Sequence, residues 1–444
     1  MESKDYYTSH ILNQINNPSV PIAQRTVDRA KDILKLLNTP KINREHLEGY
    51  CFQGIPDEFN GLRSLCWKLL LDYLPNCPAK WESTLKSYHE TYQNYLKEYF
   101  LPHKNLTLQA PTKYEGDPLN LSQELTKKSK PSEKRKTIDL PLRKHASSLY
   151  MTKKKFSEED PSLDLGPLSE GPLLLKKSLS KGPTNSTQSD ASLYEDISKD
   201  TRRTRSGMDF FRKTTDFPMK GVYSKENNKA FEKETHAEAM TRILFIYGKL
   251  NPHVGYVQGM NEVLAPIYYC FCNDQNPAFQ GSAEADSFFC FSKLMLDLHD
   301  AFLKGFDNKG VGIQARIKVL NDLLLRIDKQ VWDHLEKYNV NPQFYTLRWL
   351  MLLLTQEFEM NEVLRLWDTL LSHPKRIKYI NYICLAMILQ VKNKLIFTDE
   401  FAVIMEMMQR DTIQNFDKIL SEAFRLYKAH AKDEDLVHHI VFPL

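Results

Sequence analysis

The sequence contains few glycines and no long apolar run, and both absences exclude broad classes of protein. Sixteen glycines among 444 residues are too few for a Rossmann-type or all-β protein, because such folds depend on many tight turns. The longest apolar stretches are Tyr379–Val391 and Val263–Cys272, well short of the roughly 18 residues needed to span a bilayer. These absences favour a helical protein without a transmembrane segment.

The charges nearly cancel, and the cysteines are scattered. Sixty Lys and Arg against 56 Asp and Glu leave a formal net charge of +4, which is too small to indicate a nucleic-acid partner. Of the seven cysteines only Cys270 and Cys272 are close neighbours, and no second pair stands at zinc-finger spacing. The N-terminus has no basic segment followed by an apolar one, so no signal peptide is expected. We predict free thiols, no metal site and a cytoplasmic location.

Apolar residues recur at helical spacing along most of the chain, and no convincing run alternates as a strand would. The segments 344–358 and 379–394 are apolar on most sides, which is typical of buried helices. There is no internal repeat. The predicted fold class is therefore all-α, with helices expected over residues 24–38, 62–74, 81–100, 313–340, 344–358, 379–394 and 401–428.

The composition changes between residues 122 and 190, which are rich in Lys, Ser and Pro and contain no Trp or Cys. Such a segment cannot bury enough apolar surface to offset its chain entropy, so we predict a disordered insertion. Its lysine runs suit contact with acidic lipid, but a solvated tether is the simpler interpretation. The organisation that follows is an N-terminal helical extension (1–49), a first domain segment (50–121), the insertion (122–190), a second domain segment (191–430) and a C-terminal tail (431–444).

Motifs of the common enzyme classes are missing. The sequence has no G-x-x-x-x-G-K-[ST] loop and no G-x-G-x-x-G, so the chain is not expected to cradle a nucleotide itself. It also lacks H-E-x-x-H and G-x-S-x-G, and its 13 histidines form no recognisable ligand set. The chain is therefore expected to carry no cofactor of its own.

Three short patterns stand out against this background. Arg63 and Trp67 lie four residues apart, close enough on a helix to stack. Asp200 precedes Arg203 by three residues, a spacing that lets a carboxylate hold a projecting arginine. Two glycines bracket Gln258, which lets the backbone approach a partner closely. Each pattern alone also fits a surface ion pair or a plain turn.

Taken in order, the patterns carry a resemblance. R-x-x-x-W, then I-x-x-D-x-x-R, then Y-x-Q-G-M-N resembles the signature of the TBC-domain Rab GTPase-activating proteins. The later stretches Phe344–Trp349 and Val363–Asp368 look like further blocks of that family. The resemblance covers residues 50–121 and 191–400, interrupted by the insertion.

This resemblance implies a two-subdomain helical TBC fold and catalysis by two residues supplied in trans. Arg203 would be the arginine finger and Gln258 the glutamine finger. The residues implied to position these fingers are Asp200, Ile197, Tyr256 and Gly259. Those implied to be mainly architectural, some at the border of the partner groove, are Arg63, Trp67, Trp349, Trp367 and Asp368.

The implied partner is a Rab-family small GTPase in its GTP-bound form, which carries the GTP and Mg itself. The expected role is GTPase activation in vesicle trafficking, by a cytoplasmic protein that is peripheral on endomembranes. A catalytically silent helical scaffold that binds GTPases is the alternative, although the presence of both fingers favours activation. A lipid-surface adaptor that uses the basic insertion is compatible with either.

The sequence departs from the family pattern beside the arginine finger. Family members usually have a proline shortly after this arginine, but residues 204–206 read Thr-Arg-Ser. Loss of that rigid turn removes one constraint on the pose of the finger. Arginines at 202 and 205 also flank Arg203, so the identification of the finger depends on its spacing from Asp200.

Overall fold

A computed structural model describes residues 6–103, 189–218, 234–279, 281–302, 312–413 and 415–441. Every regular element in these ranges is helical, and their one β-type pairing is an isolated bridge between Thr214 and Thr235. This confirms the predicted all-α class. Residues 104–188 lie outside the described residues, and they include the end of the expected first domain segment and most of the expected insertion (122–190).

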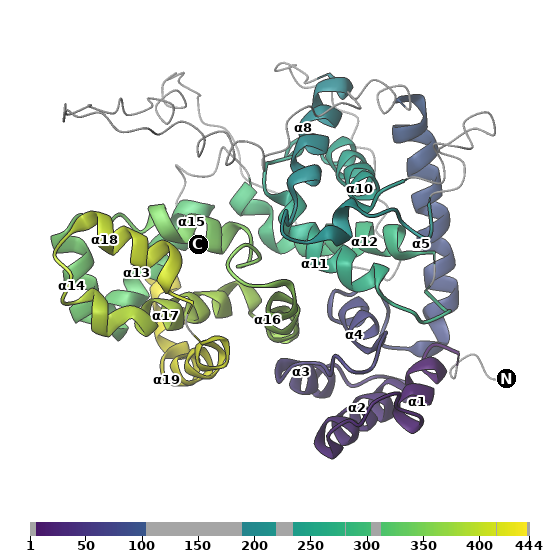
Figure 1. The fold of residues 1–444 in the computed structure, drawn as a ribbon, viewed down its shortest axis with the longest axis horizontal. Coiled ribbons are helices and arrows are strands. Elements are labelled where there is room, and N and C mark those ends of the chain that lie inside the picture. The colour runs from purple at the N-terminus through teal and green to yellow at the C-terminus, as the bar shows by residue number, and fades with distance from the viewer. Residues whose placement is uncertain are drawn as a thin grey trace, which may run out of the picture. The chain divides into compact units, whose positions relative to one another are not determined.

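The first group of helices precedes residue 303 (Figure 1). Its α-helices are α1 (Ser9–Asn16), α2 (Gln24–Leu37), α3 (Arg44–Phe52), α4 (Leu62–Leu70), α5 (Trp81–Tyr95), α8 (Asp190–Arg203), α10 (His236–Leu250), α11 (Met260–Cys272) and α12 (Ala283–Phe302). Short 3-10 turns cover Pro78–Lys80, Leu101–His103 and Asp209–Arg212, and a π-helical turn continues α5 over Leu96–Phe100.

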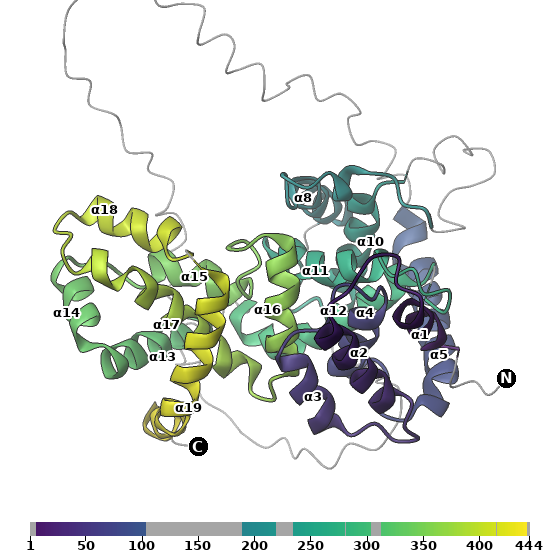
Figure 2. The ribbon, with the colours of Figure 1, turned by 60° about the horizontal axis from the view of Figure 1, so that its bottom comes forward.

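The second group follows residue 312 and includes a further π-helical turn over Met407–Asp411. Its α-helices are α13 (Ile313–Ile327), α14 (Lys329–Lys337), α15 (Gln343–Met351), α16 (Met360–Ser372), α17 (Arg376–Leu395), α18 (Phe401–Glu406) and α19 (Phe416–Val441). In this group α17 packs against α19, and α13 packs against α14 and α15 (Figure 2).

Local signals in the sequence explain where the helices around the later site begin. α10 starts with a capping box, in which the Thr235 hydroxyl accepts from the backbone of Glu238 and the Glu238 carboxylate accepts in return from Thr235. α8 starts at Ser189, whose side chain accepts from the backbone nitrogen of Ser192 at 3.2 Å. These side chains satisfy amide groups that the helix itself leaves unpaired.

The expected helix over 313–340 is wrong in one respect, because the structure divides it into α13 and α14. The break falls at Asp328, whose carboxylate accepts from the backbone nitrogen of Val331 at 3.1 Å and so caps α14. The apolar stripe continues through the break because both helices face the same core. Periodicity alone does not separate two such helices.

The expected helix over 344–358 is also too long. α15 ends at Met351, and Leu353 and Leu354 take left-handed backbone angles with φ of 49° and 62°. The carbonyl of Leu353 accepts instead from the indole nitrogen of Trp367 at 3.2 Å. In the same way, the helix expected over 401–428 is divided into α18, the π-helical turn and α19, and that over 62–74 stops at Leu70.

Contacts between helices position the candidate site. α8 packs along α10, α10 and α11 both pack against α12, and α16 packs against α3, α4 and α11 (Figure 2). The apolar side chains on these faces belong to one continuous core. As expected, the cysteines are free thiols, and each is buried or half-buried. In the described part of the chain, no helix is both long and apolar enough to cross a membrane.

Candidate functional site

Arg203 is the last residue of α8, and its side chain points into solvent. The side chain is 68% exposed, while the Asp200 carboxylate that pairs with it is 10% exposed. The ion pair spans one helical turn, as the i,i+3 spacing predicts. A buried carboxylate thus holds the base of an exposed guanidinium.

Ile197 lies on the opposite, buried side of α8. Its side chain is completely buried in the core. One turn later the Thr201 hydroxyl hydrogen-bonds to the hydroxyl of Thr241 on α10, with 2.7 Å between the oxygens. These contacts fix the end of α8 on α10, so the position of the Arg203 backbone is set by the core.

Gln258 lies in the loop between α10 and α11, and its side chain is exposed. Gly255 and Gly259 stand on either side of it with φ of 63° and 104°, backbone angles that residues with a Cβ rarely adopt. A Cβ at residue 259 would come within 2.7 Å of Cδ2 of Leu352. Gly259 is therefore required both by its own backbone and by the close approach of the segment after α15.

Tyr256 connects the Gln258 loop to the end of α8. Its hydroxyl donates to the carboxylate of Asp200 at 2.8 Å. Burial, and then the hydrogen bond to Asp200, raise the pKa of the phenol well above its usual range. Tyr256 therefore stays protonated and remains a donor to the carboxylate that also pairs with Arg203.

Asn261 adds a second connection between the same two segments. Its side-chain amide donates to the hydroxyl of Thr204 at 2.8 Å and to the carbonyl oxygen of Asp200 at 3.3 Å. The Thr204 hydroxyl in turn bonds to the same carbonyl at 3.2 Å. The C-terminal turn of α8 is thus held by the first turn of α11.

The three neighbouring arginines have different surroundings. Arg203 is exposed and paired only along its own helix, whereas the side chain of Arg205 is 12% exposed and contacts residues far away in sequence. Arg202 is exposed and lines a shallow hollow with Ser198 and Arg212. Of the three, Arg203 alone combines exposure with a buried carboxylate that orients it.

Asp368 on α16 is the centre of a buried polar cluster that includes two further sequence-derived candidates, Arg63 and Trp67. Its completely buried carboxylate accepts from Nε of Arg63 at 3.0 Å and from the indole nitrogen of Trp67 at 2.8 Å. It also accepts from the backbone nitrogen of Ile55 at 2.8 Å. Arg63 reaches further to Asp57, which is mainly exposed. The cluster joins α4 to α16.

The three candidate tryptophans are completely buried, which fits an architectural role. Trp67 and Trp367 lie against each other with their ring centroids 5.9 Å apart. Trp349 packs edge-on against Tyr345, also within the core. None of these rings reaches the surface where Gln258 and Arg203 are exposed.

The sequence has no signal for the contacts of Arg205 with Glu262 and with the carbonyls of Thr355 and Phe358. Glu262 is one of many acidic residues near a helix start, and a backbone carbonyl carries no residue identity. The Asn261 amide is part of the Y-x-Q-G-M-N stretch, but its hydrogen bond to Thr204 was not predicted. These partners are found only through tertiary contacts.

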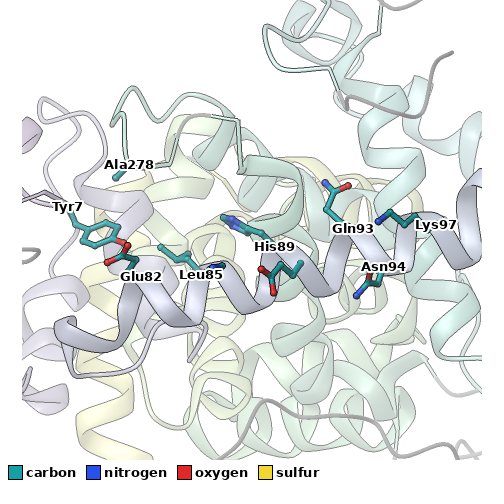
Figure 3. Close-up of a pocket in the computed structure, with 10 residues that line it drawn as sticks. Tyr7, Glu82, Leu85, His89, Gln93, Asn94, Lys97 and Ala278 are labelled. Atoms are coloured by element: carbon teal, nitrogen blue, oxygen red, sulfur yellow. The ribbon is translucent and has the colours of Figure 1, made fainter. Parts of the chain in front are cut away.

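The larger hollows of the surface lie elsewhere. One of about 510 Å³ runs along α5, which lines it with Leu85, His89 and Gln93, and Tyr7 and Ala278 lie at its end near Leu85 (Figure 3). Neither Arg203 nor Gln258 lines it. Side chains that project from the surface are suited to entering the site of another macromolecule rather than to enclosing a small one.

The chain is similar to known proteins in both sequence and fold. A family described as the Rab-GTPase-TBC domain matches residues 173–396. Human TBC1 domain family member 13 is 33% identical over 410 residues, which cover 90% of this chain and 97% of that protein. The TBC domain-containing protein C1952.17c of Schizosaccharomyces pombe is 27% identical, over 93% of this chain and 75% of its own length.

Among solved structures, the Ypt/Rab-GAP domain of Gyp1p has the same fold. It superposes with a TM-score of 0.60 at 20% identity, covering 91% of this chain and 99% of that one. The family match covers half of the chain, and the human relative is matched over almost its full length. The chain therefore belongs to the Rab-GTPase-TBC domain family.

Proposed function

We propose that this protein is a GTPase activator that stimulates GTP hydrolysis by a Rab-type small GTPase. The observation that carries the proposal is the shared Asp200 carboxylate, which pairs with Arg203 and accepts from Tyr256 in the Gln258 loop. One buried group thus couples two exposed side chains whose chemistries are complementary. Family membership supplies the class of partner.

Arg203 is proposed as the arginine finger. During GTP hydrolysis negative charge builds up on the γ-phosphoryl oxygens and on the bridging oxygen. A guanidinium offers planar, permanently charged donors that stabilise this charge more in the transition state than in the ground state. A finger of this kind contributes roughly 10³–10⁵ in rate. Lysine would keep the charge but lose the two-pronged geometry.

Gln258 is proposed as the glutamine finger. Its amide has both a donor and an acceptor, so it can orient the attacking water against the γ-phosphorus. The Gly255 and Gly259 turns set the backbone of this loop and leave the amide exposed. A glutamate would place a negative charge beside the phosphates.

In this proposal the GTP and Mg²⁺ belong to the GTPase, and the partner is bound in its GTP form. The protein acts in the cytoplasm, peripherally on endomembranes, in vesicle trafficking. The insertion lies outside the described residues, so a lipid contact there is a separate question. Co-sedimentation of the full chain with anionic liposomes, compared with a chain lacking residues 122–189, addresses it.

The test is single-turnover GTP hydrolysis by a panel of GTP-loaded Rab GTPases, with and without the protein. We expect wild-type protein to accelerate at least one of them, and Arg203→Ala, Arg203→Lys and Gln258→Ala to remove most of the acceleration. Binding to a GTP-loaded Rab without any acceleration would instead support the silent scaffold. An Arg203→Ala protein with wild-type acceleration would contradict the arginine assignment.

A further inference from the structure

Arg205 is a buried cation two residues beyond the proposed finger. Its backbone is left-handed, with φ of 47°, although it is neither glycine nor asparagine. Such a conformation costs roughly 1 kcal/mol in an ordinary residue. It persists where surrounding contacts over-determine it.

Those contacts come from two separate parts of the chain. The guanidinium donates to the carbonyl of Phe358 at 2.8 Å and to the carbonyl of Thr355, both in the segment between α15 and α16. Its Nε also lies 3.7 Å from the carboxylate of Glu262 in the first turn of α11. The side chain of Arg205 thus connects the end of α8 to two other elements, the segment between α15 and α16 and the first turn of α11.

The same two elements carry the Gln258 loop. Glu262 is four residues after Gln258 on the helix that the loop enters. The segment after α15 also approaches the loop, because Leu352 lies against Gly259. Arg205 therefore contacts both supports of the glutamine while it continues directly from the helix that presents the arginine.

We propose that Arg205 is a positioning residue that sets the pose of both fingers, taking the place of the proline expected after Arg203. This inference rests on the proposed GTPase-activating function. A proline restricts the turn through its ring, whereas Arg205 restricts it through two carbonyl hydrogen bonds and an ion pair. Contacts with both supports of the loop also couple the arginine pose to the glutamine pose, which a local proline turn does not do.

The proline turn and the buried contacts of Arg205 are alternatives, because one chain cannot have both. A proline at position 206 would push residue 205 towards extended backbone. That shift would abandon the left-handed conformation in which Arg205 reaches Thr355 and Phe358. We therefore expect Ser206→Pro alone to disturb the pose, and the double change Arg205→Ala with Ser206→Pro to be less harmful than Ser206→Pro alone.

The first experiment is single-turnover GTP hydrolysis by a responsive Rab GTPase, with the full-length protein titrated to saturation. For Arg205→Ala we expect the maximal rate to fall about 10- to 100-fold, because a small misplacement of a catalytic group has effects of that size. The half-saturating concentration should change much less, since Arg205 is buried and does not meet the partner. Arg205→Lys should recover part of the rate, because an ammonium reaches one carbonyl but not both.

Arg202→Ala is the matched control, since it removes an exposed arginine three positions before Arg205, in the last turn of α8. It should leave the maximal rate close to wild type. Circular dichroism and thermal unfolding of each variant monitor the fold. If Arg205→Ala loses its fold, Glu262→Gln replaces it as the test, with an expected several-fold loss of maximal rate and an intact fold.

A double-mutant cycle separates positioning from general damage. If Arg205 acts through both fingers, Arg205→Ala should lower the rate less in the Arg203→Ala protein than in the wild type, because only its effect on Gln258 then remains. Multiplicative losses in the double variant, or a wild-type maximal rate for Arg205→Ala, would overturn the proposal. A wrong assignment of function would give a different result from a wrong assignment of Arg205. In that case the wild-type protein would stimulate no GTPase, or Arg203→Ala would have no effect on the rate.

Discussion

The hydroxyl of Tyr256 and the carboxylate of Asp200 are 2.8 Å apart, although 56 residues separate them in the chain. Asp200 has few other ways to be satisfied in its buried position, since its second interaction is the pair with Arg203. The contact therefore places the loop of Gln258 at a defined distance from the end of α8.

Replacement of Tyr256 by phenylalanine removes this hydrogen bond and keeps the ring. We expect the free energy of unfolding to fall by about 1 kcal/mol, the usual net value of such a bond. The maximal rate of stimulated GTP hydrolysis should fall by about 10-fold, because the glutamine loop loses its connection to α8. Tyr247→Phe on α10 is a control for loss of a phenol away from the site. Equal rates for the wild type and Tyr256→Phe would remove Tyr256 from the positioning set.

Replacement of Asp368 by asparagine leaves Arg63 buried with no carboxylate partner in the core. Breaking a buried ion pair from one side costs about 3–5 kcal/mol, so the urea midpoint should drop sharply. Asp57→Asn is the matched control, because Asp57 pairs with the same arginine but has a side chain that is 63% exposed. An exposed pair is worth about 0–1 kcal/mol. Similar losses in the two variants would contradict the architectural role of Asp368.

Replacement of Gly259 by alanine should both strain the loop and push it away from Leu352. The added Cβ would stand 2.7 Å from the leucine side chain, at a φ of 104°. Gly255→Ala has a positive φ too, but nothing lies within 4 Å of its added Cβ. We expect a loss of about 1–3 kcal/mol for Gly259→Ala and a smaller one for Gly255→Ala. Thermal unfolding of the two proteins measures this difference, and a larger loss at Gly255 would contradict it.

Acidification should destabilise the protein through two buried histidines. Burial lowers the pKa of His236 to about 4, and burial likewise lowers the pKa of His373 to about 4. Between about pH 6.5 and 4 the unfolded chain binds protons that the folded protein does not, so stability falls as the pH falls. Above pH 6.5 both histidines are neutral in the folded and the unfolded chain, so they no longer lower the free energy of unfolding. Urea unfolding from pH 7 to 5 measures it, and a His236→Phe protein should have a weaker pH dependence over this range.

Local sequence information was enough for the fold class and for the pairing of Asp200 with Arg203. Apolar spacing predicted helices, and the structure has α2 and α17 where they were expected. The i,i+3 spacing of Asp200 and Arg203 predicted their pairing, because a helix by itself brings such residues together. The order of five short blocks indicated the family, which the comparisons confirm.

The extent of the helices was less predictable. Residues 344–358 are apolar throughout, yet the chain leaves the helix at Met351. The carbonyls that are freed there accept from Trp367 and Arg205, which are 14 or more residues away. Local periodicity contains no information about such acceptors, since every residue has the same carbonyl group.

Tertiary structure alone decided which polar groups meet across long separations. Arg63 and Asp368 are 305 residues apart in the chain but share one buried hydrogen-bonded cluster. Arg205 adjoins the finger in sequence, and only its burial against Phe358 and Glu262 distinguishes it from the exposed Arg203. The sequence thus determined the helices and the chemical character of the site, because these depend on neighbours within a turn. Whether an arginine is exposed, as Arg203 is, or buried, as Arg205 is, depends on packing between distant helices. Only the tertiary structure therefore decides which arginine can reach a partner.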